Sequence, residues 1–176
     1  MTEKTVSSEE IFAGRLLHVK RDDVVLPDGK QAVREWIDHP GAAAVVPLLP
    51  DGRVVMVRQF RYGPQKTFLE LPAGKFDGPE APAAVAAREL EEETGYRAGK
   101  LVHLGGLYNA VGYSNEIIHI FLATELEETR QALDEGEFLT VEFHPLEEVA
   151  GRAARGELQD MKTVSGLLMA RDRLAG

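Results

Sequence analysis

Residues 74–96 read GKFDGPEAPAAVAARELEEETGY, and this stretch decides the fold and the chemistry that we expect of the chain. It begins as a loop rich in glycine and proline, a composition that lets a backbone approach a ligand closely. It continues as a predicted helix over 82–94, because Pro82 suits the first turn of a helix and Gly95 suits the position after the last turn.

The predicted helix gathers carboxylates on one side. At about 100° per residue, Glu89, Glu92 and Glu93 fall within an arc of roughly 100°. Glu91 points away from them, and Arg88 lies one turn before Glu92, where its cation can hold that carboxylate in place. A glutamate-rich helix is often only a solvated surface. Here a separate apolar arc adjoins the carboxylates and is expected to face the core; its residues are Ala83, Ala86, Ala87 and Leu90.

The composition indicates a single globular domain. The chain has 176 residues, of which 44% are hydrophobic, enough for a packed core at this length. It has 20 Lys and Arg against 29 Asp and Glu, which argues against a nonspecific nucleic-acid binder because such proteins need a basic surface. Without cysteine it has no disulfide, thiolate metal site or cysteine nucleophile. No apolar run is long enough for a membrane span and no secretory signal is visible, so we expect a cytoplasmic protein.

Outward from the helix, hydrophobic runs bounded by Gly and Pro predict strands. Two of them, 15–26 and 31–38, form an antiparallel N-terminal segment, and 41–48 and 53–60 are expected to form a buried hairpin. Further strands are predicted over 67–71, 100–108, 117–124 and 139–144, and further helices over 145–156 and 160–174. This order predicts one mixed α/β domain with an N-terminal β extension.

The loop and helix carry a recognisable spacing: Gly74, five residues, Glu80, seven residues, and then Arg-Glu-Leu-x-Glu-Glu-x-Gly-Tyr, ending at Tyr96. This resembles the Nudix box, the signature of Nudix hydrolases, and only Tyr96 departs from the usual aliphatic residue. The resemblance implies an α/β fold, a Nudix-like α/β/α sandwich with a mixed sheet, to which the N-terminal antiparallel β extension is added. It also implies metal-dependent hydrolysis of a diphosphate.

Acidic side chains suit this chemistry through bound cations. A carboxylate cluster repels a diphosphate unless hard ions such as Mg²⁺ or Mn²⁺ join the two. Such ions offset charge on the phosphoryl oxygens and lower the pKa of a bound water. By resemblance to the family, Arg88 is an orienting partner, and Glu80 is left open between a structural and a functional role. The implied metal ligands in the box are Glu89, Glu92, Glu93 and the backbone carbonyl of Ala73.

The acidic segment Asp134-Glu135-Gly136-Glu137 resembles a family loop that supplies a further metal ligand and, in some members, the general base. We expect Glu137 to be the ligand and Glu135 the base, because a carboxylate near a metal-bound water is suited to accept its proton. Together with the box, the expected catalytic residues are Glu92, Glu93, Glu135 and Arg88.

Segments outside the box narrow the substrate. Residues 58–61 (RQFR) and 70–75 (ELPAGK) resemble segments of ADP-ribose pyrophosphatases and related nucleoside-diphosphate-sugar hydrolases. A surface ion pair is the alternative for Arg61, and core packing is the alternative for Trp36. Val111 stands where many ADP-ribose pyrophosphatases carry proline, which leaves room for GDP-mannose or another nucleotide sugar. The resemblance implies substrate contacts from Arg34, Trp36, Arg61, Glu70, Glu116 and Lys162.

The prediction is therefore a hydrolase that uses Mg²⁺ or Mn²⁺ to split ADP-ribose, or a similar nucleoside diphosphate sugar, into a nucleoside monophosphate and a sugar phosphate. Residues 1–40 form the extension, through which such family members pair as homodimers and share substrate contacts, and residues 41–176 form the Nudix domain. Three alternatives stay open: hydrolysis of GDP-mannose or a dinucleoside polyphosphate, nucleotide sensing without catalysis, and a purely structural acidic helix. We expect neither a nucleic-acid polymer nor a membrane as partner.

Overall fold

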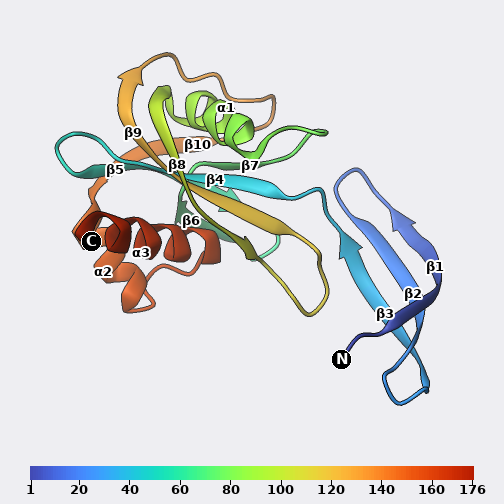
Figure 1. Cartoon of the computed structure of the whole chain (residues 1–176). Coiled ribbons are helices and arrows are strands. Elements are labelled where there is room, and N and C mark those ends of the chain that lie inside the picture. The colour runs from blue at the N-terminus through green and yellow to red at the C-terminus, as the bar shows by residue number, and fades with distance from the viewer. The chain divides into compact units, whose positions relative to one another are not determined.

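The computed structural model describes all 176 residues and divides the chain into two compact units. The smaller unit holds residues 1–41 and 108–117, and the larger unit holds residues 42–107 and 118–176. Figure 1 labels the helices and strands of both. None of the helices combines the length and the apolar character that crossing a membrane requires.

Two sheets form the frame of the larger unit. The strands of the first are β4 (Ala42–Pro47), β7 (Ala73–Lys75), β8 (Tyr96–Tyr108) and β9 (Ile117–Glu128). Their order is β7-β4-β9-β8, and the sheet is mixed because β4 runs parallel to β9 and antiparallel to β7. The strands of the second are β5 (Arg53–Arg61), β6 (Lys66–Glu70) and β10 (Leu139–Pro145). They pair antiparallel in the order β10-β5-β6.

Helices cover both faces of the mixed sheet, as Figure 1 shows. They are α1 (Pro82–Thr94), α2 (Leu146–Ala154) and α3 (Met161–Ala175). Alternate residues of β4 face the two layers: Ala43 and Val45 pack with α1, whereas Ala44 and Val46 pack with α2 and α3. A strand covered on both faces is apolar throughout, which explains the unbroken hydrophobic run. The predicted α/β/α sandwich with a mixed sheet is confirmed.

The ends of the helices follow from local sequence signals. Pro82 lies in the first turn of α1, and Gly95 ends this helix in the left-handed conformation with a φ of 72°. The Asp160 side chain accepts a hydrogen bond from the backbone N–H of Thr163 and so caps α3. The predicted span of the central helix, 82–94, is confirmed.

The predicted hairpin of 41–48 and 53–60 is wrong. Both runs form strands, but β4 and β5 belong to different sheets and are joined only by an isolated bridge between Leu48 and Val54. Both edges of β4 are already paired, one with β7 and the other with β9. A continuous apolar run indicates that a strand is buried, but not with which strand it pairs.

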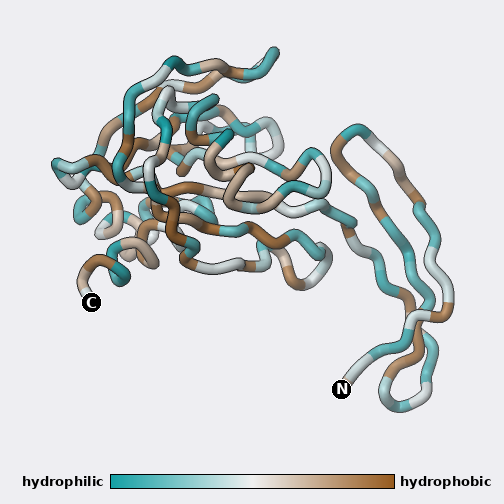
Figure 2. Tube along the Cα trace, turned by 45° about the horizontal axis from the view of Figure 1, so that its top comes forward, coloured by the Kyte–Doolittle hydropathy of each residue, from teal (hydrophilic) through white to brown (hydrophobic).

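The smaller unit is an antiparallel meander of β1 (Lys4–Ala13), β2 (His18–Val25) and β3 (Gln31–Asp38). Strand β1 is not among the predicted strands, because its sequence is largely polar and lacks the alternation that signals one buried face. Figure 2 shows this largely hydrophilic strand, in contrast to the hydrophobic strands of the larger unit. The loop 109–116 belongs to the smaller unit, where the Ile37 N–H donates to the Tyr113 carbonyl at 2.7 Å.

Candidate active site

Backbone hydrogen bonds fix the start of β7 between the sheet and α1. The N–H of Ala73 donates to Oε2 of Glu93 at 3.2 Å. One residue earlier, the Pro72 carbonyl accepts a hydrogen bond from the Val45 N–H of β4 at 2.9 Å. Glu93 therefore contacts Ala73, the residue whose carbonyl the resemblance implies as a metal ligand.

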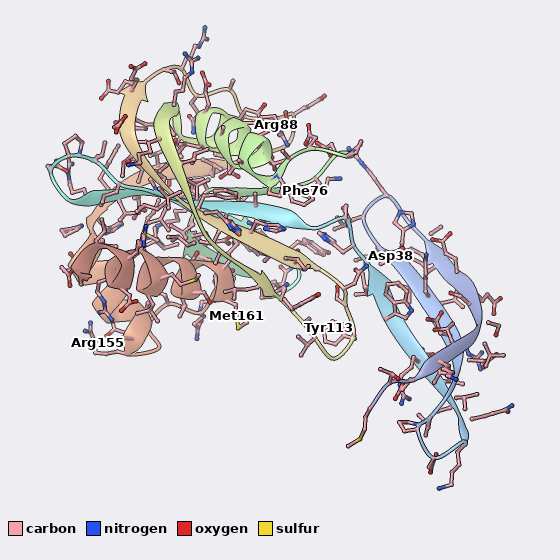
Figure 3. The ribbon with its side chains drawn as sticks, in the orientation of Figure 1. Asp38, Phe76, Arg88, Tyr113, Arg155 and Met161 are labelled. Carbon is pink, nitrogen blue, oxygen red and sulfur yellow. The ribbon has the colours of Figure 1, made fainter.

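Gly74 lies directly against the carboxylate of Glu89. A Cβ atom added to Gly74 would lie 1.9 Å from Oε1 and 2.0 Å from Cδ of Glu89, far inside van der Waals contact. Only glycine leaves room for this carboxylate over β7. In Figure 3 the neighbouring segment is marked by Phe76, which follows β7, and the helix by Arg88.

Helix α1 buries two of its carboxylates. Glu93 is 3% exposed and the side chain of Glu89 is 12% exposed, whereas the side chain of Glu92 keeps 33% of its surface. The sequence predicts an apolar face of this helix that is separate from its carboxylate face, and that prediction is wrong. Ala83, which was expected on the buried face, is exposed, whereas Val85, which was not expected there, is buried. Glu89 and Glu93 point toward the sheet. Gly74 of β7 leaves space for the Glu89 carboxylate, and the Ala73 N–H donates a hydrogen bond to Glu93.

Burial gives these carboxyls unusual pKa values. Burial raises the pKa of Glu93 to about 8, and the negative charges of Glu89 and Glu137 add to the shift. Burial also raises the pKa of Glu89 to about 7, although the Arg88 cation opposes that shift. Glu89, Glu93 and Glu137 thus form a cluster whose negative charge the neighbouring cations do not neutralise. Its oxygen donors and its charge fit a hard divalent cation such as Mg²⁺.

Arg88 is bound to this cluster through its guanidinium. Nη1 lies 2.8 Å from Oε1 of Glu89 and donates a hydrogen bond to Oε2 of Glu92 at 2.9 Å, which confirms the predicted contact with Glu92. Nη2 has no hydrogen-bond partner and lies 3.8 Å from Glu80 and 3.9 Å from Asp77. No three His, Asp or Glu side chains converge as a preformed metal site. The guanidinium instead bridges the carboxylates of Glu89 and Glu92.

The acidic loop before β10 contributes one carboxylate to the cluster. Glu137 is half-buried, and its charge raises the pKa of both Glu89 and Glu93. Its backbone N–H donates to the Asp134 carbonyl at 3.1 Å, which closes a turn in the loop. Glu135 is exposed in the same turn. The loop therefore brings Glu137 near the box glutamates and leaves Glu135 at the surface.

A second charged group joins β5, β6 and α3. Glu70 is 2% exposed and accepts hydrogen bonds from Nε of Arg61 at 2.9 Å and from Nη2 of Arg61 at 2.7 Å. It also accepts a hydrogen bond from Nζ of Lys162, which donates to Asp160 at 2.9 Å as well. Burial alone would raise the pKa of Glu70, but Arg61 and Lys162 hold it below its usual value. The structure thus brings together three of the predicted substrate-binding residues.

Thr163 ties α3 to the segment 70–74, and it is not among the residues that the sequence predicts for the site. It is fully buried, and its hydroxyl accepts a hydrogen bond from the Leu71 N–H at 2.9 Å. Asp160 caps the same residue through its N–H at 3.1 Å. The sequence signal is an Asp three residues before a Thr at a helix start, which predicts the cap but not the bond to Leu71.

The other predicted substrate contacts lie in the smaller unit. Arg34 donates to Glu3 through Nε at 2.9 Å and Nη2 at 2.6 Å. Trp36 donates through Nε1 to Asp22 at 3.0 Å. Its ring lies under the Lys20 ammonium, 5.6 Å from the ring centroid. In a separate part of this unit, Oε2 of Glu116 accepts a hydrogen bond from Asn109 at 2.9 Å, and Oε1 lies 3.6 Å from Nδ1 of His39.

The mixed sheet between its two helical layers defines an α/β/α protein. Its buried glutamates form an acidic site of the kind that phosphate-cleaving enzymes use. Residues 38–165 match the NUDIX domain, and residues 3–37 match the nucleoside diphosphate sugar hydrolase N-terminal domain. The chain belongs to the Nudix hydrolase family, as the box predicts.

Known proteins similar to this chain agree with that family. It is 43% identical over 165 residues to an ADP-ribose pyrophosphatase of Bacillus subtilis (strain 168), covering 93% of this chain and 89% of the relative. It is 40% identical over 164 residues to a methanol dehydrogenase activator of Bacillus methanolicus, covering 92% and 89%. A crystal structure of an ADP compounds hydrolase matches all of this chain and 96% of its own with a TM-score of 0.87 at 25% identity.

Proposed function

We propose that the protein hydrolyses the diphosphate of ADP-ribose, or of a similar nucleoside diphosphate sugar, to a nucleoside monophosphate and a sugar phosphate. The observation that carries this proposal is the buried glutamate cluster of Glu89 and Glu93, packed against Ala73 and Gly74 within a Nudix box. Similarity to an ADP-ribose pyrophosphatase and to an ADP compounds hydrolase supports an ADP-containing substrate.

Divalent cations are part of the proposal, and the donor set fits them. Glu89, Glu93 and Glu137, with the carbonyl of Ala73, would hold Mg²⁺ or Mn²⁺, and Glu92 would be a further ligand or helper. When bound, such an ion offsets charge on the phosphoryl oxygens and lowers the pKa of a water. The protein's own part is orientation: the Ala73 N–H holds Glu93, and the guanidinium of Arg88 holds two glutamates of α1.

Proton transfer is assigned to the acidic loop. Glu135 is exposed and belongs to the turn that carries Glu137, so it is free to approach the attacking water when substrate is bound. A carboxylate near a metal-bound water is suited to accept the proton of that water. Glu135 is therefore the proposed general base.

We assign the binding of the substrate phosphates to the charged group of Arg61, Glu70 and Lys162. Glu70 binds Nε and Nη2 of Arg61, which fixes the plane of the guanidinium and leaves Nη1 for a phosphate oxygen. Lys162 brings a second cation to the same place. Glu70 thus orients these cations, and we propose this role for it in place of a direct substrate contact.

The smaller unit is proposed to supply nucleoside contacts and a homodimer interface. Trp36 offers an aromatic ring to a base, and Arg34 and Glu116 offer polar contacts. Its sheet carries exposed apolar side chains, which favour burial against a second copy; these are Val6, Ile11, Phe12 and Val33. The division into residues 1–40 and 41–176 and the cytoplasmic location remain predictions.

The experiment that tests the proposal is a substrate panel with and without a chelator. Purified protein is incubated with ADP-ribose and with GDP-mannose, in Mg²⁺ or in excess chelator, and released monophosphate is measured. We expect fastest turnover with ADP-ribose and none with the chelator. Tight nucleotide binding without products would support the sensing alternative instead.

GDP-mannose is the second candidate substrate because of one loop. Val111 is 82% exposed in the loop 109–116, at the place where many ADP-ribose pyrophosphatases carry proline. If GDP-mannose is turned over faster than ADP-ribose in the same panel, the preferred substrate changes while the hydrolase assignment stays.

A further inference from the structure

Two histidines on neighbouring strands of the mixed sheet face each other. Nδ1 of His119 on β9 lies 3.2 Å from Nε2 of His103 on β8. The ring centroids are 5.4 Å apart, and the ring planes are inclined by 38°. His119 pairs in register with Ala43, which packs with α1, so the two rings lie on the α1 face of the sheet.

Aromatic rings flank this pair. The ring centroid of His103 lies 5.0 Å from that of Phe121, and the centroid of His119 lies 6.1 Å from that of Phe76. Figure 3 shows Phe76 on the segment between β7 and α1. The two imidazoles therefore lie between Phe76 and Phe121 on this face of the sheet.

The pair differs from the other histidines of the chain in its partner. His18, His39 and His144 each have a glutamate oxygen within 4.0 Å of a ring nitrogen. His103 and His119 have no carboxylate within that distance and have each other instead. An imidazole nitrogen without a proton is a metal ligand.

The spacing of the two nitrogens matches that of two imidazoles on one metal ion. Zn–N bonds are about 2.0–2.1 Å long, so two nitrogens on a tetrahedral zinc ion stand about 3.3 Å apart. To converge on an ion, each ring has to turn by roughly 40° from the line that joins the nitrogens, which the broad terminal torsion of histidine allows. Because His103 is exposed, water can complete the coordination.

We propose that His103 and His119 form a second metal site, specific for a borderline ion such as Zn²⁺ or Cu²⁺ and separate from the carboxylate cluster. Imidazole nitrogen prefers such ions, whereas Mg²⁺ takes oxygen ligands. Ala43 pairs with Gly74 on one side and with His119 on the other. At about 4.8 Å per strand, His119 therefore lies roughly 10 Å from the strand position that Glu89 covers.

Zinc titration of the full chain tests this site. Isothermal calorimetry is carried out with saturating Mg²⁺, the ion that the proposed function assigns to the carboxylate cluster. We expect one Zn²⁺ to bind per chain, and His103→Gln, an exposed substitution that leaves the core untouched, to weaken binding at least tenfold. Two variants are matched controls with unchanged zinc affinity: His18→Gln, which changes a histidine paired with Glu10, and Glu93→Gln, which changes the carboxylate cluster.

Cu²⁺ gives a second readout that depends on ligand identity. Electron paramagnetic resonance of the protein with one equivalent of Cu²⁺ is expected to show coupling to two nitrogens, and to one in His103→Gln. Zinc affinity that is unchanged in His103→Gln, or lost in Glu93→Gln, would overturn the proposal. Neither result would affect the proposed hydrolysis, which is measured without Zn²⁺.

Discussion

Gly74 and Glu89 depend on each other, and this contact sets the chemistry of the site at the residue scale. The carboxylate occupies the space that any larger residue of β7 would fill. The same packing removes water from Glu89 and Glu93 and raises both pKa values. Buried carboxylates of this kind are costly unless a partner neutralises them, and the partner that we propose is a divalent cation.

Gly74→Ala tests the close approach. The added methyl group pushes away the end of the flexible Glu89 side chain, so we expect kcat/KM for ADP-ribose to fall at least tenfold while thermal stability changes little. Gly63→Ala is the matched control, because a Cβ atom there meets nothing within 4 Å. Equal activity of the two variants would show that the position of the Glu89 carboxylate does not matter.

The raised pKa values predict how stability depends on pH in the metal-free protein. Because the pKa is about 7 for Glu89 and about 8 for Glu93, against an ordinary 4.5, the folded state binds more protons than the unfolded state between these values. The free energy of unfolding therefore falls as pH rises from about 4.5 to 8. Urea unfolding in chelator measures this. The fall is expected to be smaller in Glu93→Gln, and a flat profile in the unsubstituted protein would contradict the burial argument.

At the scale of elements, α3 and α1 hold the segment 70–74 from its two sides. Thr163 of α3 accepts a hydrogen bond from Leu71, and Glu93 of α1 accepts one from Ala73. Glu70 adds the ion pairs to Arg61 and Lys162. The start of α3 is thus part of the support of the site.

Thr163→Val tests that support. The substitution keeps the shape of the side chain but leaves the buried Leu71 N–H without an acceptor, so we expect a loss of about 1–3 kcal/mol in the free energy of unfolding. Thr163→Ser keeps the hydroxyl and is expected to lose less. Denaturant unfolding of the two variants decides, and a loss in Thr163→Val no larger than the loss in Thr163→Ser would contradict the importance of the hydroxyl.

Local sequence signals predicted the helices and strands better than they predicted which strands pair with each other. Pro82, Gly95 and Asp160 act within a few residues, so the helix over 82–94 and the cap of α3 follow from the sequence. The pairing of β4 with β7 and β9 involves residues far apart in the chain, and nothing in its apolar run encodes that choice. The box singled out Glu89, Glu92 and Glu93 as expected metal ligands. It did not predict that Glu93 is buried, because its burial depends on the backbone of β7.

At the scale of the whole molecule, the chain combines a Nudix domain with an N-terminal sheet that exposes apolar side chains. The loop 109–116 is continuous with two strands of the larger unit but packs within the smaller one. The proposed substrate contacts of the smaller unit are Arg34, Trp36 and Glu116, and those of the larger unit are Arg61 and Lys162.

A homodimer is the expected state of the full chain in solution. Val33→Asp places a charge among the exposed apolar side chains of the N-terminal sheet, so we expect it to shift the protein toward monomer in analytical ultracentrifugation. Val111→Asp, at an exposed apolar residue outside that sheet, is the control. A full chain that sediments as a monomer at all concentrations would contradict the proposed interface.

The central claim is that the buried glutamates of α1 hold the metal that hydrolysis requires. Its most direct test is turnover of ADP-ribose by Glu93→Gln compared with Glu91→Gln, two changes of the same chemistry on one helix. Glu91 pairs with Arg97 at the surface, whereas Glu93 is buried against Ala73. We predict that Glu93→Gln lowers kcat by at least about 100-fold without unfolding the protein, and that Glu91→Gln changes it less than about threefold. Turnover by Glu93→Gln close to that of Glu91→Gln would contradict the account.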